Sequence, residues 1–145
     1  MSNVNWRSIN VAQYFEDMYE EPEEVKWDNS GVETLIENND YQGALFELCS
    51  NPPENAIEVS KAEARGYFCK ILSKTKNSEF SSFVKTLDPF QLTNCMKYIY
   101  VAFEQDEVKK SGGKLNGKLL QWHGKVKDLG GVGCVVRAMV SRATL

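Results

Sequence analysis

Apolar residues recur with a helical period along most of the chain after residue 30. The clearest example follows Asp40, where positions i, i+3, i+4, i+7 and i+8 are Tyr41, Ala44, Leu45, Leu48 and Cys49. Similar stripes return in the segments that follow. Together they predict seven helices, at about residues 32–36, 41–49, 56–76, 78–87, 89–104, 115–129 and 132–140.

Polar residues, glycines and a proline separate these segments. Asn39 or Asp40 can cap the second helix with a side-chain oxygen. Asp88-Pro89 is an N-cap followed by proline at the first helical position, which is a strong start signal. The two glycines at 130–131 predict a helix stop, and the polar stretch 105–113 predicts a surface loop.

The segment 89–104 is apolar nearly all round, which is typical of a helix in the middle of a bundle or beneath a partner. Its polar residues Asn94 and Lys97 are expected to reach the remaining surface. The segment 132–140 is rich in valine, which favours strands through its stiff χ1, but its spacing and the absence of a partner strand favour a helix. The pattern therefore predicts an all-α fold with about seven helices.

Charge and aromatic content set the first thirty residues apart. Residues 1–30 carry seven acids and two bases, a net of −5, whereas residues 108–145 carry eight bases and one acid, a net of +7. Residues 1–30 also hold five of the sixteen aromatic residues, and disordered segments are usually poor in aromatics. We therefore expect an acidic arm, residues 1–30, that lies against a partner or against its own helical body, residues 31–145.

Residue types that usually carry catalysis or bind metals are scarce. The four cysteines are widely spaced: Cys49, Cys69, Cys95 and Cys134. Three of them fall in apolar stripes, so we expect reduced, buried side chains and no metal site. His123, the one histidine, has no orienting partner of the kind that general-base catalysis requires, so we expect a packed or interface histidine. Gly130-Gly131-Val132-Gly133 lacks the strand and the Lys-Ser/Thr of a phosphate loop. The sequence predicts neither an enzyme nor a bound cofactor.

Hydropathy and net charge narrow the classes of partner. A pI near 5.3 and scattered lysines weigh against counterion-driven binding of nucleic acid. The basic C-terminal third is either a solvated face or a site for an acidic surface, on another protein or on the chain's own arm. No apolar run approaches the ~20 residues that span a bilayer. The first residues show no secretory-type stretch, so we expect a cytoplasmic protein.

Several short strings occur in the order and spacing of one known family. They are Met96-Lys97-Tyr98-Ile99-Tyr100 with Phe103-Glu104, then Leu119-Leu120-Gln121-Trp122-His123, then Gly130-Gly131-Val132-Gly133 with Val136-Arg137. Near the N-terminus, Trp6-Arg7-x-Ile9-x-Val11 precedes an acidic stretch. In these strings the chain resembles the smallest subunit of the actin-related protein 2/3 complex.

The resemblance implies a compact, right-turning helical bundle or superhelix preceded by an extended N-terminal arm. It also implies a structural role in a seven-subunit assembly that nucleates branched actin filaments in the cytoplasm, at the actin cytoskeleton and cell projections. In that family the body sits against the β-propeller subunit and another small scaffold subunit. The arm tethers one actin-related subunit, and contact with actin filaments is indirect.

The resemblance and the residue types together suggest candidate contacts. Aromatic and Arg anchors usually carry interface energy, and the arm offers Trp6, Arg7, Ile9, Val11, Tyr14 and Phe15. The body candidates are Tyr98, Trp122, His123 and Arg137. The chain departs from the family at Asn10 and Ala12-Gln13, where the arm tends to be acidic, and in a lysine-rich loop at 105–114. The alternative function is a free-standing helical adaptor that binds acidic peptides or nucleic acid through the basic C-terminal third.

Overall fold

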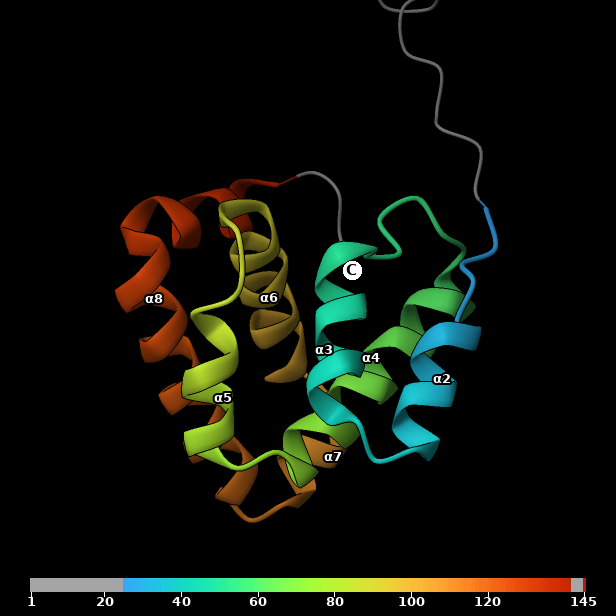
Figure 1. Cartoon of the computed structure of the whole chain (residues 1–145), viewed down its shortest axis with the longest axis horizontal. Helices are drawn as coiled ribbons and strands as arrows, with labels where there is room; N and C mark the ends of the chain where they lie inside the picture. Colours follow the sequence, from blue (N-terminus) through green and yellow to red (C-terminus); the bar gives the residue numbers. More distant parts are fainter. Residues whose placement is uncertain (1–24, 142–144) are drawn as a thin grey trace, which may run out of the picture.

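The computed structural model describes residues 25–141 and residue 145. In this part of the chain helices joined by short loops make up the structure, and the one β-type pairing is an isolated bridge between Val25 and Ala56. The helices are α2 (Ser30–Glu37), α3 (Tyr41–Ser50), α4 (Glu58–Lys74), α5 (Asn77–Val84), α6 (Pro89–Ala102), α7 (Asp106–Lys110) and α8 (Lys114–Val140) (Figure 1). The predicted all-α fold with about seven helices is confirmed. The candidate arm contacts, from Trp6 to Phe15, lie outside the described residues.

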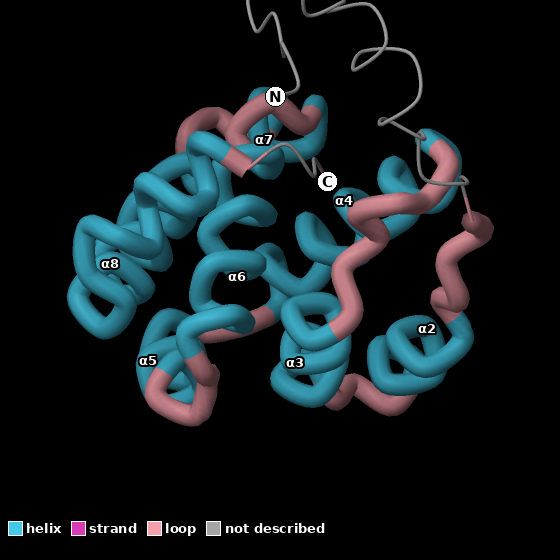
Figure 2. Tube along the Cα trace, turned by 90° about the horizontal axis from the view of Figure 1, so that it is seen from above, coloured by secondary structure: helices cyan, strands magenta, loops and turns pink. Residues whose placement is uncertain are grey.

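Helix α6 lies at the centre of the molecule, with α8, α5, α3 and α4 around it (Figure 2). Its most extensive pairing is with α8, and it also packs on α3 and α4. Most of its side chains are buried, as the apolar pattern of this segment predicts. Asn94 differs from the prediction because it is buried. Its Nδ2 donates to the Cys49 carbonyl oxygen at 2.8 Å, whereas its buried Oδ1 has no hydrogen-bond partner.

Four aromatic rings run through the core and join four helices. The indole of Trp122 on α8 stacks on Phe80 of α5, with ring centroids 3.9 Å apart. Phe68 of α4 meets Trp122 edge-on at 6.0 Å and stacks on Tyr98 of α6 at 5.3 Å. Such ring pairs add stability beyond the area that they bury. The stack therefore fixes α5 and α8 against the centre of the bundle.

Two helix starts form where the sequence predicts them. Asp88 accepts a hydrogen bond from the Gln91 backbone N–H at 2.7 Å, and the Gln91 side chain accepts one from the Asp88 N–H at 3.1 Å. At α3 the cap is Asp40, which accepts from the Gly43 N–H at 3.0 Å. A Cβ at Gly43 would lie 2.5 Å from a carboxylate oxygen of Asp40, so a larger residue there would displace the capping carboxylate.

Replacing Asp88 with alanine should lower the free energy of unfolding by about 1 kcal/mol, because the first turn of α6 loses its side-chain acceptor. Urea denaturation of the purified chain measures this change. Asp128→Ala is the matched control, since Asp128 is an exposed acid inside α8 and not at a helix start. The control should change the free energy by less than about 0.5 kcal/mol. Equal effects of the two substitutions would show that the cap does not contribute.

The last third of the chain departs from the prediction in two details. The stretch predicted as a loop contains the short helix α7, in which Val108 is fully buried. Burial of this one apolar side chain accounts for a turn of helix that its polar neighbours do not predict. The predicted helix stop at the two glycines is an interruption inside α8, at Gly131, where φ is 70° and ψ is −179°.

No described helix is long and apolar enough to cross a membrane.

Candidate protein-interaction surface

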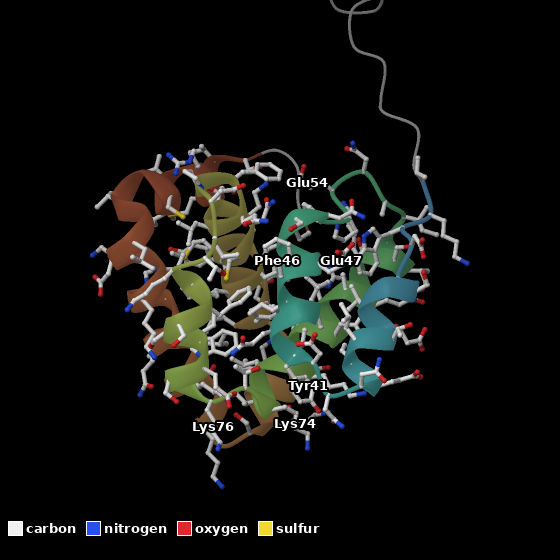
Figure 3. All side chains as sticks on the ribbon, viewed as in Figure 1. Tyr41, Phe46, Glu47, Glu54, Lys74 and Lys76 are labelled. Atoms are coloured by element: carbon white, nitrogen blue, oxygen red, sulfur yellow. The ribbon has the colours of Figure 1, made fainter. Side chains whose placement is uncertain are left out.

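The second half of α8, after Gly131, carries large apolar side chains that face away from the body. With Leu129 just before the break, they form what we call the α8 stripe: Leu129, Val132, Val136, Met139 and Val140. The exposed fractions of these side chains lie between 50% and 71%. The other exposed large apolar residues of the described chain are spread over several elements, as with Phe46, which Figure 3 labels on α3. The stripe is thus the largest group of exposed apolar side chains on one helix.

Small residues occupy the opposite side of the same segment, toward α6. They are Gly130, Cys134 and Ala138, which follow one another at four-residue intervals. A Cβ at Gly130 would lie 2.8 Å from the Cβ of Cys134 and 3.7 Å from Cδ1 of Leu92 on α6, so only glycine fits. Cys134 is fully buried and Ala138 packs against the core. The small residues let the end of α8 lie close to α6.

Two of the four candidate body contacts lie in the core. Tyr98 is 1% exposed and Trp122 is 0% exposed, and both rings belong to the aromatic stack. Trp122 also donates its indole N–H to Oδ1 of Asn77 at 3.2 Å. Burial raises the pKa of the Tyr98 phenol, with smaller contributions from Cys49 and Glu54, so the phenol stays neutral. These two residues hold the fold together, and the expectation that they touch a partner is wrong for the chain as folded here.

The other two candidate body contacts remain partly accessible. Nε2 of His123 lies 2.9 Å from the hydroxyl of Tyr100, and the two rings meet edge-on with centroids 5.5 Å apart. Arg137 is exposed beside the α8 stripe, and its Nε donates to Oγ1 of Thr93 on α6 at 3.2 Å. Burial raises the pKa of Tyr100. His123 and Arg137 stay predictions as partner contacts.

The described part of the predicted arm is anchored on the helical body. Trp27 is buried, and its indole N–H donates to the carbonyl oxygen of Asn51 at 3.0 Å. The backbone of Val25 accepts a hydrogen bond from the Ile57 N–H at 3.4 Å and donates one to Asn55 O at 3.0 Å. An open pocket of about 440 Å³ lies beside this anchor, lined in part by Trp27, Pro53 and Phe90. Residues 25–30 therefore pack on the body, while residues 1–24 lie outside the description.

Charged residues are unevenly distributed between the helices α8 and α2. Helix α8 carries five basic residues (Lys114, Lys118, Lys125, Lys127, Arg137) and one acid, Asp128. Helix α2 carries two acids, Glu33 and Glu37, and no base. Nζ of Lys118 lies 5.9 Å above the Trp122 ring, and burial lowers the pKa of this lysine. The four lysines lie before the break at Gly131, and Arg137 is the one basic residue on the segment after it.

The cysteines serve packing in this fold. All four are buried, as predicted, and none forms a disulfide. The hydrogen bond between the Cys49 and Cys95 side chains, together with burial, raises the pKa of the Cys49 thiol well above its ordinary value. A thiol with a raised pKa is a poor nucleophile at neutral pH. Within the described residues, no group of three or more histidine, cysteine or acidic side chains could hold a metal ion.

Comparison with known proteins assigns the family. The family described as "ARP2/3 complex 16 kDa subunit (p16-Arc)" matches residues 5–145 of the chain. The chain belongs to the p16-Arc family. Its similarity to the Xenopus laevis "Actin-related protein 2/3 complex subunit 5-B" is 32% identity over 148 residues, which covers 97% of this chain and 94% of the relative. The resemblance seen in the sequence strings is thereby confirmed.

Two other p16-Arc relatives align over less of the chain. The human "Actin-related protein 2/3 complex subunit 5-like protein" is 34% identical over 119 residues, which is 81% of this chain and 74% of the relative. The Saccharomyces cerevisiae "Actin-related protein 2/3 complex subunit 5" is 24% identical over 114 residues, or 79% and 71% of the two chains. The p16-Arc family of subunits is linked by its name to actin nucleation and the cytoskeleton.

The α8 stripe was not recognised as an exposed surface from the sequence of this p16-Arc protein. The sequence shows Val132, Val135, Val136, Met139 and Val140 as one apolar helical set. It also holds a second set at the same period, Gly130, Cys134 and Ala138, which turns out to be the inner side. The sequence signal that could have identified the inner side is the difference in side-chain size between the two sets. Small residues allow two helices to approach closely, so the set of small residues is expected to face the neighbouring helix.

Proposed function

We propose that this chain is a non-catalytic structural subunit of the actin-related protein 2/3 complex and supports the nucleation of branched actin filaments. The observation that carries the proposal is the family match over residues 5–145. A helical body that leaves a stripe of large apolar side chains uncovered supports it, because such a surface is typical of chains that are buried in an assembly. On this proposal the chain works in the cytoplasm, at the actin cytoskeleton and cell projections.

The body's role is to dock on the scaffold of the complex. We propose that it binds the β-propeller subunit and another small scaffold subunit. The exposed apolar side chains on the second half of α8 support this role. His123 and Arg137, which remain partly accessible, are the surviving candidates for polar contacts at such an interface.

The arm's role is to tether one actin-related subunit. We propose that Trp6, Arg7, Ile9, Val11, Tyr14 and Phe15 supply the contacts. The anchoring of residues 25–30 supports this role, because a tether transmits force only if its root is fixed. The buried indole of Trp27 and the backbone pairing of Val25 with the segment 55–57 provide that fixed root. Contact with actin filaments is then indirect, through the assembled complex.

Deleting residues 1–20 should leave the body folded but loosen the actin-related subunit. The deletion stops short of Val25 and Trp27, whose contacts hold the arm's root to the body. Circular dichroism of the truncated chain should show an unchanged helical signal and melting temperature. Gel filtration of the purified complex should show that the actin-related subunit dissociates more readily, and branch formation should fall in a pyrene-actin assay.

Two single substitutions act as controls for the deletion. Trp6→Ala should weaken the tether without changing the stability of the isolated chain. Trp27→Ala should instead lower the stability, since this indole is buried and hydrogen-bonded. Failure of the truncated chain to fold, or a complex that holds equally well without the arm, would contradict the proposed role. Binding that occurred only to polyanions and vanished steeply with salt would favour the adaptor alternative.

A further inference from the structure

Seven lysines gather where the end of α4 meets the start of α8. They come from two segments without an acidic residue: residues 70–76 carry three lysines and residues 109–118 carry four. Helices α4 and α8 pack on each other, and residues of both segments line one pocket, so the segments lie side by side. Two of the lysines are labelled at the lower edge of the molecule in Figure 3. We call this group the basic patch: Lys70, Lys74, Lys76, Lys109, Lys110, Lys114 and Lys118.

An open pocket lies within the basic patch. Its volume is about 200 Å³, and it is lined by Gly66, Cys69, Lys70 and Ser73 of α4 and by Leu115 of α8. A cavity of about 150 Å³ holds benzene, so a single aromatic ring fits here. Gly66 lies inside α4, is exposed, and a Cβ there would meet nothing within 4 Å. Glycine weakens a helix at such a position, but it allows another backbone to approach closely.

We propose that the acidic stretch of the chain's own arm, residues 16–24, docks on the basic patch in the free chain and places the ring of Tyr19 in this pocket. The stretch contains no base, and opposite charges across a contact favour association. The tether contacts proposed above, Trp6 to Phe15, precede this stretch and stay available to a partner. The docking therefore goes beyond the proposed function. The acids of the stretch are Glu16, Asp17, Glu20, Glu21, Glu23 and Glu24.

The place where the arm meets the body puts the basic patch within its reach. The Ile57 N–H donates to the carbonyl oxygen of Val25 at 3.4 Å, so the arm ends directly beside the start of α4. From Glu58 to Lys70 the helix rises about 18 Å, at 1.5 Å per residue. An extended chain covers about 3.3 Å per residue, so the residues from Val25 back to Tyr19 span about 20 Å. Tyr19 can therefore reach the pocket, and the acids that precede it can reach the lysines beyond.

Charge and proximity favour the chain's own arm over other occupants. A two-fold dimer would bring two basic patches together, and like charges oppose association. A tethered segment also has an effective concentration on the order of millimolar, which a separate acidic protein in dilute solution does not match. Ion pairs between exposed groups contribute little to folding stability. The contact should therefore show itself as proximity and not as a change in melting temperature.

Photochemical cross-linking of the free full-length chain tests where the arm lies. Benzoylphenylalanine replaces Tyr19, and the cross-linked peptides are identified by mass spectrometry at about 10 mM salt, where charge interactions reach about 30 Å. The cross-links should join the arm to residues 66–73 and 114–118 of the same chain, and should fall at least fivefold at about 1 M salt. Cross-links to other surfaces or to a second copy would overturn the proposal, as would an arm that reaches no part of the body.

Charge reversal tests whether the basic patch itself holds the arm. Lys70→Glu combined with Lys74→Glu should reduce the cross-links at least fivefold. Lys85→Glu combined with Lys127→Glu is the matched control, since both lysines are exposed and lie outside the patch. The control should leave the cross-links within about twofold of the unmodified chain. If both pairs have the same effect, the arm responds only to the net charge of the body, and the proposal is wrong.

Reversal on both sides separates a direct contact from a folding defect. Glu16→Lys combined with Asp17→Lys should also weaken the cross-links, and joining it to Lys70→Glu and Lys74→Glu should restore at least half of them. Circular dichroism checks that each chain is folded, and Lys70→Gln with Lys74→Gln replaces the reversed pair if that pair does not fold. Absence of restoration in folded chains would show that these acids and lysines do not meet.

The pocket is tested from the side of the body. Benzoylphenylalanine in place of Lys114, which is exposed beside Leu115, should capture the arm of the same chain. Tyr19→Ala should lower this capture at least threefold, because the pocket loses its ring. Tyr14→Ala, outside the acidic stretch, should leave it within about twofold. Equal effects of the two tyrosine substitutions would overturn the placement of Tyr19 in the pocket.

Discussion

Replacing Trp122 with alanine is expected to lower the free energy of unfolding by about 3–5 kcal/mol, the range for truncating a buried indole. The side chain is fully buried and stacks on Phe80 with ring centroids 3.9 Å apart. It also meets Phe68 edge-on, so the truncation opens a cavity at the junction of three helices. Domains of this size are stable by about 5–15 kcal/mol. The variant should therefore be partly unfolded at moderate urea concentrations where the unmodified chain is folded.

Two further substitutions separate the contributions to this loss. Trp122→Phe keeps much of the packing but removes the indole N–H that donates to Asn77 at 3.2 Å, so a smaller loss of about 1–3 kcal/mol is expected. Leu120→Ala is the control on the same helix, since Leu120 is 64% exposed and its truncation should cost less than about 0.5 kcal/mol. Urea denaturation followed by circular dichroism gives all three values. A Trp122→Ala variant as stable as Leu120→Ala would show that the aromatic stack does not hold the bundle together.

Burial of Trp122 also shows where prediction from the sequence stops. Local signals were sufficient for most of the helices, though not for α7, because a capping side chain such as Asp88 and a 3.6-residue apolar period act within a few residues. Whether an aromatic side chain lies in the core or on a partner depends on what the other helices bring to it. Trp122 stacks on Phe80 of α5, and Tyr98 stacks on Phe68 of α4. The spacing of residues within one helix does not predict these contacts between helices.

The α8 stripe was missed for a related reason. Both sides of the segment after Gly131 are free of charge except for Arg137. Hydropathy alone therefore does not show which side of this segment faces the core. Side-chain volume distinguishes them, because the small residues Gly130, Cys134 and Ala138 lie on the inner side, where Cys134 is fully buried. Predicting the candidate site would have required the packing of α8 against α6. Predicting the fold class required only the local pattern of the sequence. The arm contacts from Trp6 to Phe15 stay predictions, because they lie outside the described residues.

Replacing Gly131 with alanine is expected to lower the free energy of unfolding by about 1–3 kcal/mol, because the backbone there adopts a conformation that side chains with a Cβ rarely occupy. Its φ of 70° and ψ of −179° interrupt α8 and set the direction of the second half. Alanine favours a negative φ, so the variant either stores strain or continues the helix straight. A straight helix would carry the second half of α8, and the stripe with it, away from α6. Retention in the complex should then fall together with stability.

Gly124→Ala gives the matched comparison, with an effect of the opposite sign. Gly124 lies inside the regular part of α8, and a Cβ there would meet nothing within 4 Å. Alanine at such a position should raise the free energy of unfolding by about 0.5–1 kcal/mol, since it reduces the freedom of the unfolded chain. Urea denaturation of both variants measures the difference between two glycines on one helix. A Gly131→Ala variant that gained stability as Gly124→Ala does would mean that the chain tolerates a straight α8, and the break would then have no part in presenting the stripe.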